Sequence, residues 1–138
     1  MQIEDIRRHF AADKYLTATG VVIEDAGPDW CRCRLQVTAE HLNAGGVAQG
    51  GAIYTLADSA FAVACNYAHL ADGTGRLTVS QSAAISYISP GLAGSTLYAE
   101  ARRVGRGKRT CVFQIDVTDQ AGKPVATMTG NGFTIDPK

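Results

Sequence analysis

The sequence predicts an α+β fold in which an antiparallel sheet packs around one long helix, and three observations support this. One long stretch with helical periodicity follows the glycine-rich loop over residues 42–51 and ends near residues 72–75. Two shorter runs with strand-like residue usage precede it and four follow it. Turn-forming residues separate these runs, as in antiparallel sheets. Because there is no internal repeat or linker, residues 1–138 are expected to form one domain.

The elements before the long helix are predicted to be a short helix and a hairpin. Apolar residues at helical spacing predict an amphipathic helix over residues 3–14. Strands are predicted over residues 17–24 and 30–37, joined by a turn at 25–29. In the second strand apolar and polar side chains alternate, so that one face would be buried.

A glycine-rich loop over residues 42–51 leads directly into the long helix. Its apolar stripe has i, i+3, i+4, i+7 spacing and consists of Ile53, Leu56, Ala57, Ala60, Phe61 and Ala64. The opposite face is largely alanine, so the helix should be covered on most sides, and it should end near Asp72-Gly73-Thr74-Gly75, where glycine can stop it. The remaining strands are predicted over residues 77–89, 96–104, 110–118 and 125–135.

Composition and charge exclude several classes of protein. Thirteen basic residues balance thirteen acidic ones, so the chain lacks the basic footprint of a nucleic-acid-binding protein. The most apolar stretch, residues 50–71, contains Asp58 and is predicted to be a buried helix rather than a membrane span. The N-terminus has no apolar run resembling a secretory signal, so we expect a cytoplasmic protein.

The cysteines and histidines do not form a metal-binding pattern. Cys31 and Cys33 are two residues apart, which is not the usual zinc spacing, and no second pair accompanies them. His9, His41 and His69 share no ligand spacing. We therefore expect free thiols in a reducing compartment and no metal site.

Asp58 is the most unusual residue of the long helix. Aspartate is a poor helix-interior residue, and burying an unpaired carboxylate is costly. No Lys or Arg occurs between Arg34 and Arg76, so the helix supplies no ion-pair partner. Either Asp58 lies on an exposed strip together with Asn66, or it is a functional carboxylate.

The start of the helix offers a second chemical feature. Gly50 and Gly51 lie in the first turn, where backbone N–H groups have no intrahelical acceptor. Such donors, together with the helix dipole, suit a developing oxyanion, although two glycines can also mark only a turn. Asn43 in the preceding loop adds an amide that can hold a water or a carbonyl.

Gly50 and Asp58 cannot act on one carbonyl within a single chain. Eight residues of helix separate them, which is roughly 12 Å. An oxyanion donor and a base must both reach one carbon atom at about 3 Å. Two antiparallel helices related by a two-fold axis would satisfy this, so the hypothesis requires a homodimer with two shared sites.

The combined motif resembles a known family: Leu42-Asn43, Gly46, Gln49-Gly50-Gly51 and Leu56-Ala57-Asp58-Ser59-Ala60. It is similar to hotdog-fold acyl-CoA thioesterases of the phenylacetate-degradation group, which are related to 4-hydroxybenzoyl-CoA thioesterases with an acidic residue on the central helix. The resemblance extends over nearly the whole chain through Ser89-Pro90-Gly91, Gly107-Lys108-Arg109-Thr110 and Gly122-Lys123. It implies the hotdog fold, in which the sheet wraps around the central helix.

The resemblance also implies catalytic roles. Asp58 would be the nucleophile or general base, the Gly50 amide would polarise the thioester carbonyl, and Asn43 would orient water or the carbonyl. Many members carry His before the two glycines, where this chain has Gln49. Glutamine can donate a hydrogen bond but cannot titrate near neutral pH, so Gln49 is expected at the site but not as an acid or base.

The implied substrate is an aryl- or medium-chain acyl-CoA, and the resemblance implies no cofactor beyond the coenzyme A of the substrate. Gly51 is expected to contact substrate, and the walls of the acyl pocket are expected to include Tyr54, Phe61 and residues 80–87. The phosphates of coenzyme A suit the basic cluster of Arg106, Lys108 and Arg109, whose alternative interpretation is a solvated hairpin tip.

Two other functions are weighed against hydrolysis. A hotdog acyl-thioester dehydratase would use a His with a carboxylate, and no His lies at this loop-to-helix junction. A non-catalytic acyl-CoA-binding hotdog protein would gain nothing from a buried Asp58. We expect a homodimer that pairs into a homotetramer. The tetramer arrangement, the preferred acyl group and the choice between nucleophile and base stay open.

Overall fold

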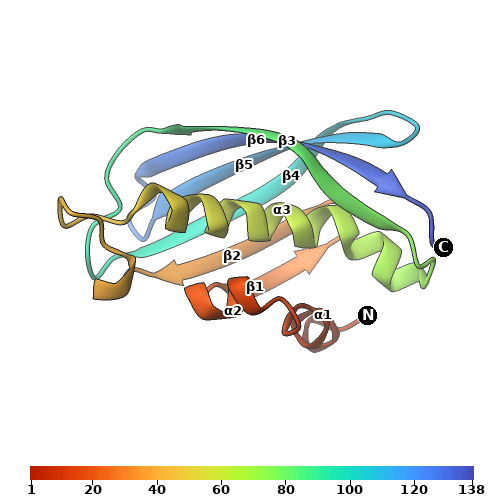
Figure 1. The fold of residues 1–138 in the computed structure, drawn as a ribbon, viewed down its shortest axis with the longest axis horizontal. Coiled ribbons are helices and arrows are strands. Elements are labelled where there is room, and N and C mark those ends of the chain that lie inside the picture. The colour runs from red at the N-terminus through yellow and green to blue at the C-terminus, as the bar shows by residue number, and fades with distance from the viewer.

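The computed structural model describes residues 1–138 and confirms the predicted α+β arrangement. Six strands form one antiparallel sheet in the order β1-β2-β4-β5-β6-β3. The long helix α3 lies across one face of this sheet (Figure 1) and contacts all six strands. This is the hotdog arrangement that the resemblance implied.

The elements have the following bounds. The strands are β1 Val22–Gly27, β2 Trp30–Gln36, β3 Leu77–Tyr87, β4 Thr96–Arg106, β5 Thr110–Asp119 and β6 Pro124–Ile135. The helices are α1 Ile3–Phe10, α2 Lys14–Thr19, the short 3-10 turn η1 Ala39–His41 and α3 Gly50–Asp72. Gly73 ends α3 in the left-handed conformation, with φ of 65°, as the sequence predicted.

The N-terminal region differs from the prediction. The helix predicted over residues 3–14 ends at Phe10, and a second helix, α2, begins at Lys14. The segment predicted as a strand over 17–24 therefore begins inside α2. Asp13 starts this second helix by accepting a hydrogen bond from Leu16 N–H at 3.0 Å. Gly20, with φ of 94°, ends it, so the strand starts only at Val22. Leu16 is buried, and this packing outweighs the strand propensity of the neighbouring threonines.

The core lies between α3 and the inner face of the sheet. Phe61 of α3 is 1% exposed, and its ring lies 5.5 Å from that of Phe113 on β5. The ring also rests against Gly130 of β6, where any Cβ atom would collide with it. Phe61, which was expected to contact substrate, is therefore a core residue held by the sheet.

The two edges of the sheet are treated differently. Arg7 of α1 donates to Ile23 O at 2.8 Å and to Glu24 O at 3.1 Å, which covers part of the β1 edge. The β3 edge has no such cover. Several apolar side chains on and just after β3 are exposed: Leu77, Val79, Tyr87 and Ile88.

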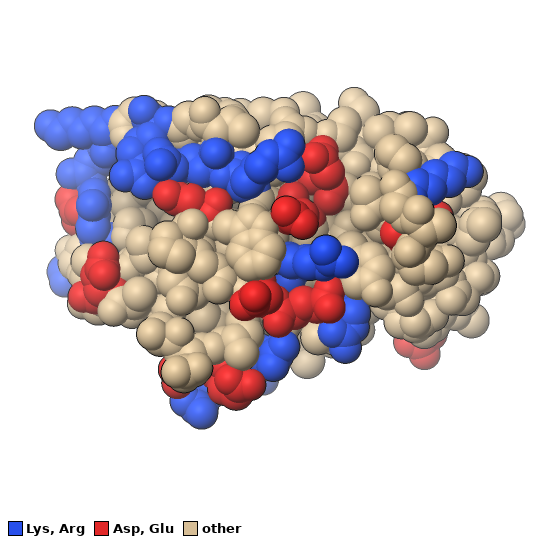
Figure 2. All heavy atoms as spheres, turned by 180° about the vertical axis from the view of Figure 1, so that it is seen from behind, with Lys and Arg blue, Asp and Glu red and all other residues tan.

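The outer face of the sheet is polar (Figure 2), with acidic and basic side chains interleaved across its middle. Arg32 pairs with Glu24 at 3.1 Å, and Arg102 pairs with Asp116 at 3.1 Å. Basic side chains gather at the upper left of this view, at the end of the molecule that carries the β4–β5 hairpin. None of the helices is both long and apolar enough to span a bilayer.

Candidate active site

The loop-to-helix junction leaves a single backbone donor free. The amides around it all have acceptors: Ala48 N–H donates to Gly91 O (2.8 Å), Gln49 N–H to His41 O (2.7 Å), Gly51 N–H to Gln49 Oε1 (2.5 Å) and Ala52 N–H to Gln49 O (2.9 Å). The Gly50 N–H donates to no acceptor in the protein. Because it lies at the positive end of a 23-residue helix, this amide is placed to bind a carbonyl oxygen or an oxyanion.

Gln49 is the N-cap residue of α3. Its side-chain oxygen accepts a hydrogen bond from the Gly51 N–H, so one role of this glutamine is to stabilise the first turn of α3. The side-chain NH₂ group of Gln49 has no acceptor in the protein and retains the donor capacity that the sequence suggested. A Cβ atom on Gly51 would lie 2.6 Å from the Gln49 oxygen, which explains the second glycine.

Asn43 shapes the loop through its amide oxygen. That oxygen accepts from Gly45 N–H at 2.9 Å and from Val47 N–H at 3.3 Å. The NH₂ group of Asn43 is left to donate, and the residue is exposed. Asn43, Gly50 and Tyr87 line one surface hollow of about 360 Å³. The structure thus brings the loop amide beside the free backbone donor.

Asp58 is half-buried and makes no hydrogen bond or ion pair with the protein. Burial raises the pKa of its carboxyl above the ordinary value, and the nearby carboxylate of Asp13 raises it further. Tyr54, one turn earlier, is close enough that the charge of Asp58 adds to the effect of burial in raising the pKa of its phenol. A carboxylate without partners in such a place is typical of a functional site.

The structure rejects the alternative in which Asp58 and Asn66 share an exposed strip. Asn66 is 7% exposed. Its amide donates to Thr78 O at 2.9 Å and accepts from Thr78 N–H at 2.8 Å, which joins α3 to the start of β3. Asn66 is therefore a satisfied structural residue, whereas Asp58 is not.

Replacing Asp58 with Asn is expected to stabilise the fold at neutral pH by about 1 kcal/mol. The raised pKa means that the folded state favours the protonated carboxyl. Protonated Asp58 therefore contributes to the stability of the fold. This contribution is complete at pH values below the pKa of Asp58 in the unfolded chain, and it is lost as the pH rises through the higher pKa of the folded state. Urea unfolding at pH 7 and near pH 3.5 checks this, because the gap between Asp58→Asn and the wild type should close at the lower pH. A less stable variant at pH 7 would contradict it.

One side of α3 is only partly covered along most of its length. Residues spaced three or four apart lie on it, and none is buried: Gly51, Thr55, Asp58, Ala62, Cys65 and His69. Gly51 and Thr55 also line a groove against Tyr15 of α2. At the other end, Cys65 and His69 line a second cavity. Asp58 therefore lies between two hollows on the same side of the helix.

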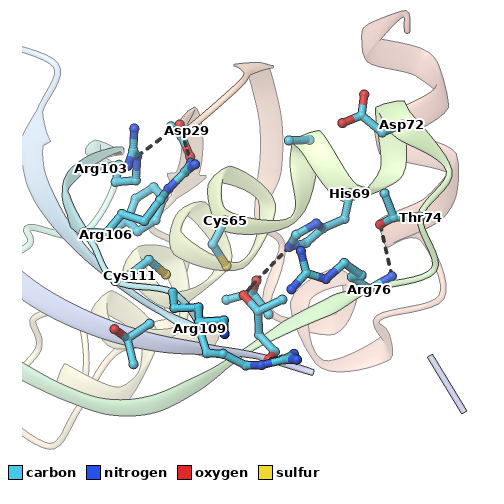
Figure 3. Close-up of a pocket in the computed structure, with 17 residues that line it drawn as sticks. Asp29, Cys65, His69, Asp72, Thr74, Arg76, Arg103, Arg106, Arg109 and Cys111 are labelled. Carbon is cyan, nitrogen blue, oxygen red and sulfur yellow. Dashed lines mark hydrogen bonds and ion pairs between the residues drawn. The ribbon is translucent and has the colours of Figure 1, made fainter. Parts of the chain in front are cut away.

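The second cavity (Figure 3) has a volume of about 260 Å³, and its lining carries more basic than acidic side chains, the acidic ones being Asp29 and Asp72. Five cationic side chains line it: Arg76, Arg103, Arg106, Lys108 and Arg109. Asp29 pairs with Arg103 at 3.1 Å and with Arg106 at 3.5 Å, and Asp136 pairs with Arg76 at 3.1 Å and with Arg109 at 2.8 Å. Lys108 has no acidic partner. The predicted basic cluster of Arg106, Lys108 and Arg109 therefore lies at the tip of the β4–β5 hairpin and lines this cavity.

Arg76 joins this cluster through the tertiary structure, whereas Arg103 lies three residues before Arg106 on β4. Arg76 precedes β3 and lies far from the hairpin in sequence, so no local signal connects it to the other cations. His69 completes the wall, with Nε2 at 3.0 Å from Thr78 Oγ1. Burial lowers the pKa of His69, and the charge of Arg76 lowers it further. Such a cavity suits an anionic group.

His41 and the buried cysteines have structural rather than catalytic contacts. His41 uses both ring nitrogens on backbone groups, with Nδ1 accepting from Thr38 N–H at 3.0 Å and Nε2 at 2.6 Å from Thr19 O. All four cysteines are free, and Cys31 and Cys33 are buried with their sulfurs 3.7 Å apart. No group of three or more His, Cys, Asp or Glu side chains is placed to hold a metal ion.

Known proteins share this sequence and fold. The model of the family described as "Thioesterase superfamily" matches residues 45–126, more than half of the chain. Acyl-coenzyme A thioesterase PaaI of Escherichia coli strain K12 is 35% identical over 89% of this chain and 84% of that protein. The solved E. coli PaaI structure, from the phenylacetic acid degradation operon, matches with a TM-score of 0.87 at 31% identity over 98% of this chain and 94% of that one.

A further solved structure is that of smu.793 from Streptococcus mutans UA159, bound to acetyl CoA. It matches with a TM-score of 0.74 at 27% identity, over 86% of this chain and 91% of that one. The matched family region includes the glycine pair, Asp58 and the basic hairpin. On this similarity of sequence and fold, the chain belongs to the Thioesterase superfamily.

Proposed function

We propose that this chain hydrolyses acyl-CoA thioesters to a free acid and coenzyme A, at two active sites shared between the subunits of a homodimer. The family and the similarity to an acyl-CoA thioesterase support the reaction class. The observation that carries the proposal is the free Gly50 N–H at the start of the helix that also bears the unpartnered Asp58 carboxylate. The Gly50 N–H can donate a hydrogen bond to the thioester carbonyl, and the Asp58 carboxylate can act as a base or nucleophile.

The roles follow from the chemistry of thioester hydrolysis. The Gly50 N–H donates a hydrogen bond to the carbonyl oxygen and, together with the α3 dipole, stabilises the negative charge that develops there. Asp58 either removes a proton from the attacking water or attacks the carbonyl carbon itself, and both routes need its ionised form. In either route the C–S bond breaks, and the coenzyme A thiolate leaves and takes up a proton. Attack by water gives the free acid directly, whereas attack by Asp58 gives a mixed anhydride, which a water molecule then hydrolyses to release the acid and restore the carboxylate. The proposed reaction uses only water and requires no metal or redox cofactor.

A shared site is required because roughly 12 Å of helix separates Gly50 from Asp58 within one chain. The uncovered β3 edge supplies a surface on which a second copy could extend the sheet. Pairing there around a two-fold axis would place the antiparallel α3 helices side by side. The proposed homotetramer would join two such dimers, and light scattering would distinguish the two states.

The basic cavity would bind the phosphates of the coenzyme A. Cys65 and His69, on its wall, are seven and eleven residues beyond Asp58, or roughly 10 and 16 Å along the helix. The pantetheine arm between the diphosphate and the sulfur has the bond count of about four peptide residues, or roughly 14 Å when extended. An arm lying along this partly covered side of α3 would therefore connect the cavity to Asp58.

Replacing Lys108 with Ala is expected to raise KM for acyl-CoA about fivefold, as for loss of an exposed charge pair of roughly 1 kcal/mol, with kcat little changed. Lys108 is chosen because, unlike the four arginines that line the cavity, it forms no ion pair with a carboxylate of the protein. Steady-state kinetics with an acyl-CoA and with the same acyl group on N-acetylcysteamine, which lacks phosphates, checks this. The second substrate should show no change. Lys123→Ala, at the opposite end of β5 and β6, is the matched control, and an equal effect there would contradict the assignment.

The experiment that tests the function is release of free thiol from a panel of short-chain, medium-chain, long-chain and aryl acyl-CoAs. Turnover of an aryl- or medium-chain member above the others would support the proposed substrate class. No turnover of any member would overturn the hydrolase and favour a non-catalytic acyl-CoA-binding protein. The proposal places the protein in the cytoplasm, in keeping with its four free cysteines.

A further inference from the structure

Tyr87 makes a contact with the proposed oxyanion donor that no motif indicated. It is the last residue of β3, and its hydroxyl donates to Gly50 O at 2.8 Å. Its ring packs against the same glycine, because a Cβ atom on Gly50 would lie 3.2 Å from Tyr87 Cζ and Oη. The residue is 51% exposed, so the contact is not a by-product of core packing.

The peptide group between Gly50 and Gly51 is held at both ends. Tyr87 binds its carbonyl oxygen, and Gln49 Oε1 binds its N–H. Two consecutive glycines would otherwise give the helix start more conformational freedom than any other pair of residues. The preceding amide, the Gly50 N–H, is the one left free. Fixing the peptide that follows Gly50 therefore also limits the directions in which this N–H can point.

We propose that Tyr87 is a positioning residue, whose hydroxyl holds the first turn of α3 so that the Gly50 N–H keeps the direction needed to bind the thioester oxygen. The inference rests on the proposed function for its catalytic consequence. It also connects the edge strand β3 to the active site. A hydrogen-bond donor of fixed direction stabilises a transition state better than a mobile one, because no reorganisation is needed during the reaction.

The test is Tyr87→Phe, which keeps the ring and removes only the hydroxyl. We expect kcat for acyl-CoA to fall about tenfold, as for the loss of one neutral hydrogen bond, while KM stays within twofold. Tyr98→Phe is the control, since Tyr98 lies on the outer face of the sheet under Arg32. A rise in KM at constant kcat would overturn the inference, because it would mean direct contact with substrate. An unchanged kcat would also overturn it.

A second measurement keeps the inference testable apart from activity. Backbone ¹⁵N relaxation in the free protein should show a lower order parameter for the Gly50 amide in Tyr87→Phe than in the wild type, while amides in the middle of α3 stay unchanged. Equal order at Gly50 in both proteins would overturn the positioning role. A wild type that hydrolyses no acyl-CoA would instead refute the proposed function, and the relaxation result would still decide whether Tyr87 orders Gly50.

Discussion

Asp58→Asn is expected to lower kcat for acyl-CoA hydrolysis by ~10²-fold or more, a loss of about 2.7 kcal/mol of transition-state stabilisation. The substitution keeps the size of the side chain and removes the charge. An amide can neither accept the proton of the attacking water nor attack the carbonyl carbon. Because Asp58 makes no hydrogen bond or ion pair, the loss should come without loss of the fold.

The measurement is thiol release with the best acyl-CoA, as a function of pH. In the wild type, kcat should fall as pH falls through the raised pKa of Asp58, which gives the pH profile an acidic limb. The residual activity of the variant should lack this limb. Asp13→Asn is the control: asparagine also caps α2, and removing the Asp13 charge should move the limb to lower pH. If Asp58→Asn were as active as the wild type, Asp58 would not be the catalytic carboxylate.

Gly50→Pro is expected to lower kcat by about 10²–10³-fold, the range found when one oxyanion donor is removed. Proline lacks the N–H but suits the first helical position, and Gln49 already has the extended backbone that proline requires of its predecessor. Gly50→Ala is the matched control. It retains the N–H while placing a Cβ atom 3.2 Å from the Tyr87 ring. Equal losses in both variants would show that space at Gly50, rather than its N–H, is what matters.

The two inactive variants together test the shared site. When Gly50→Pro and Asp58→Asn chains exchange subunits, each mixed dimer contains one site built from an intact Gly50 and an intact Asp58. Random mixing should therefore restore about a quarter of the wild-type activity. If each site belonged to a single chain, mixing would restore nothing.

Local sequence patterns were sufficient to predict most helices and strands of this protein and two of its candidate site residues. The central helix and the six strands were predicted from the long apolar periodicity after the glycine-rich loop, the alternating runs and the turn residues. Each of these signals lies within a few residues of the chain. The same holds for the candidate chemistry. Asp58 and Gly50 are conspicuous in the sequence because a carboxylate in an apolar helix and a glycine pair at its start conflict with local preference.

Other features were decided only by tertiary structure. Residues 14–19 became a helix because Leu16 packs into the core, and Phe61 faces the sheet because Gly130 leaves room for its ring. Arg76 lines the basic cavity, and Tyr87 contacts Gly50, only because the fold brings together segments that are distant in sequence. Helical and strand periods specify which face a side chain occupies, but the register of distant segments decides which atoms that face meets.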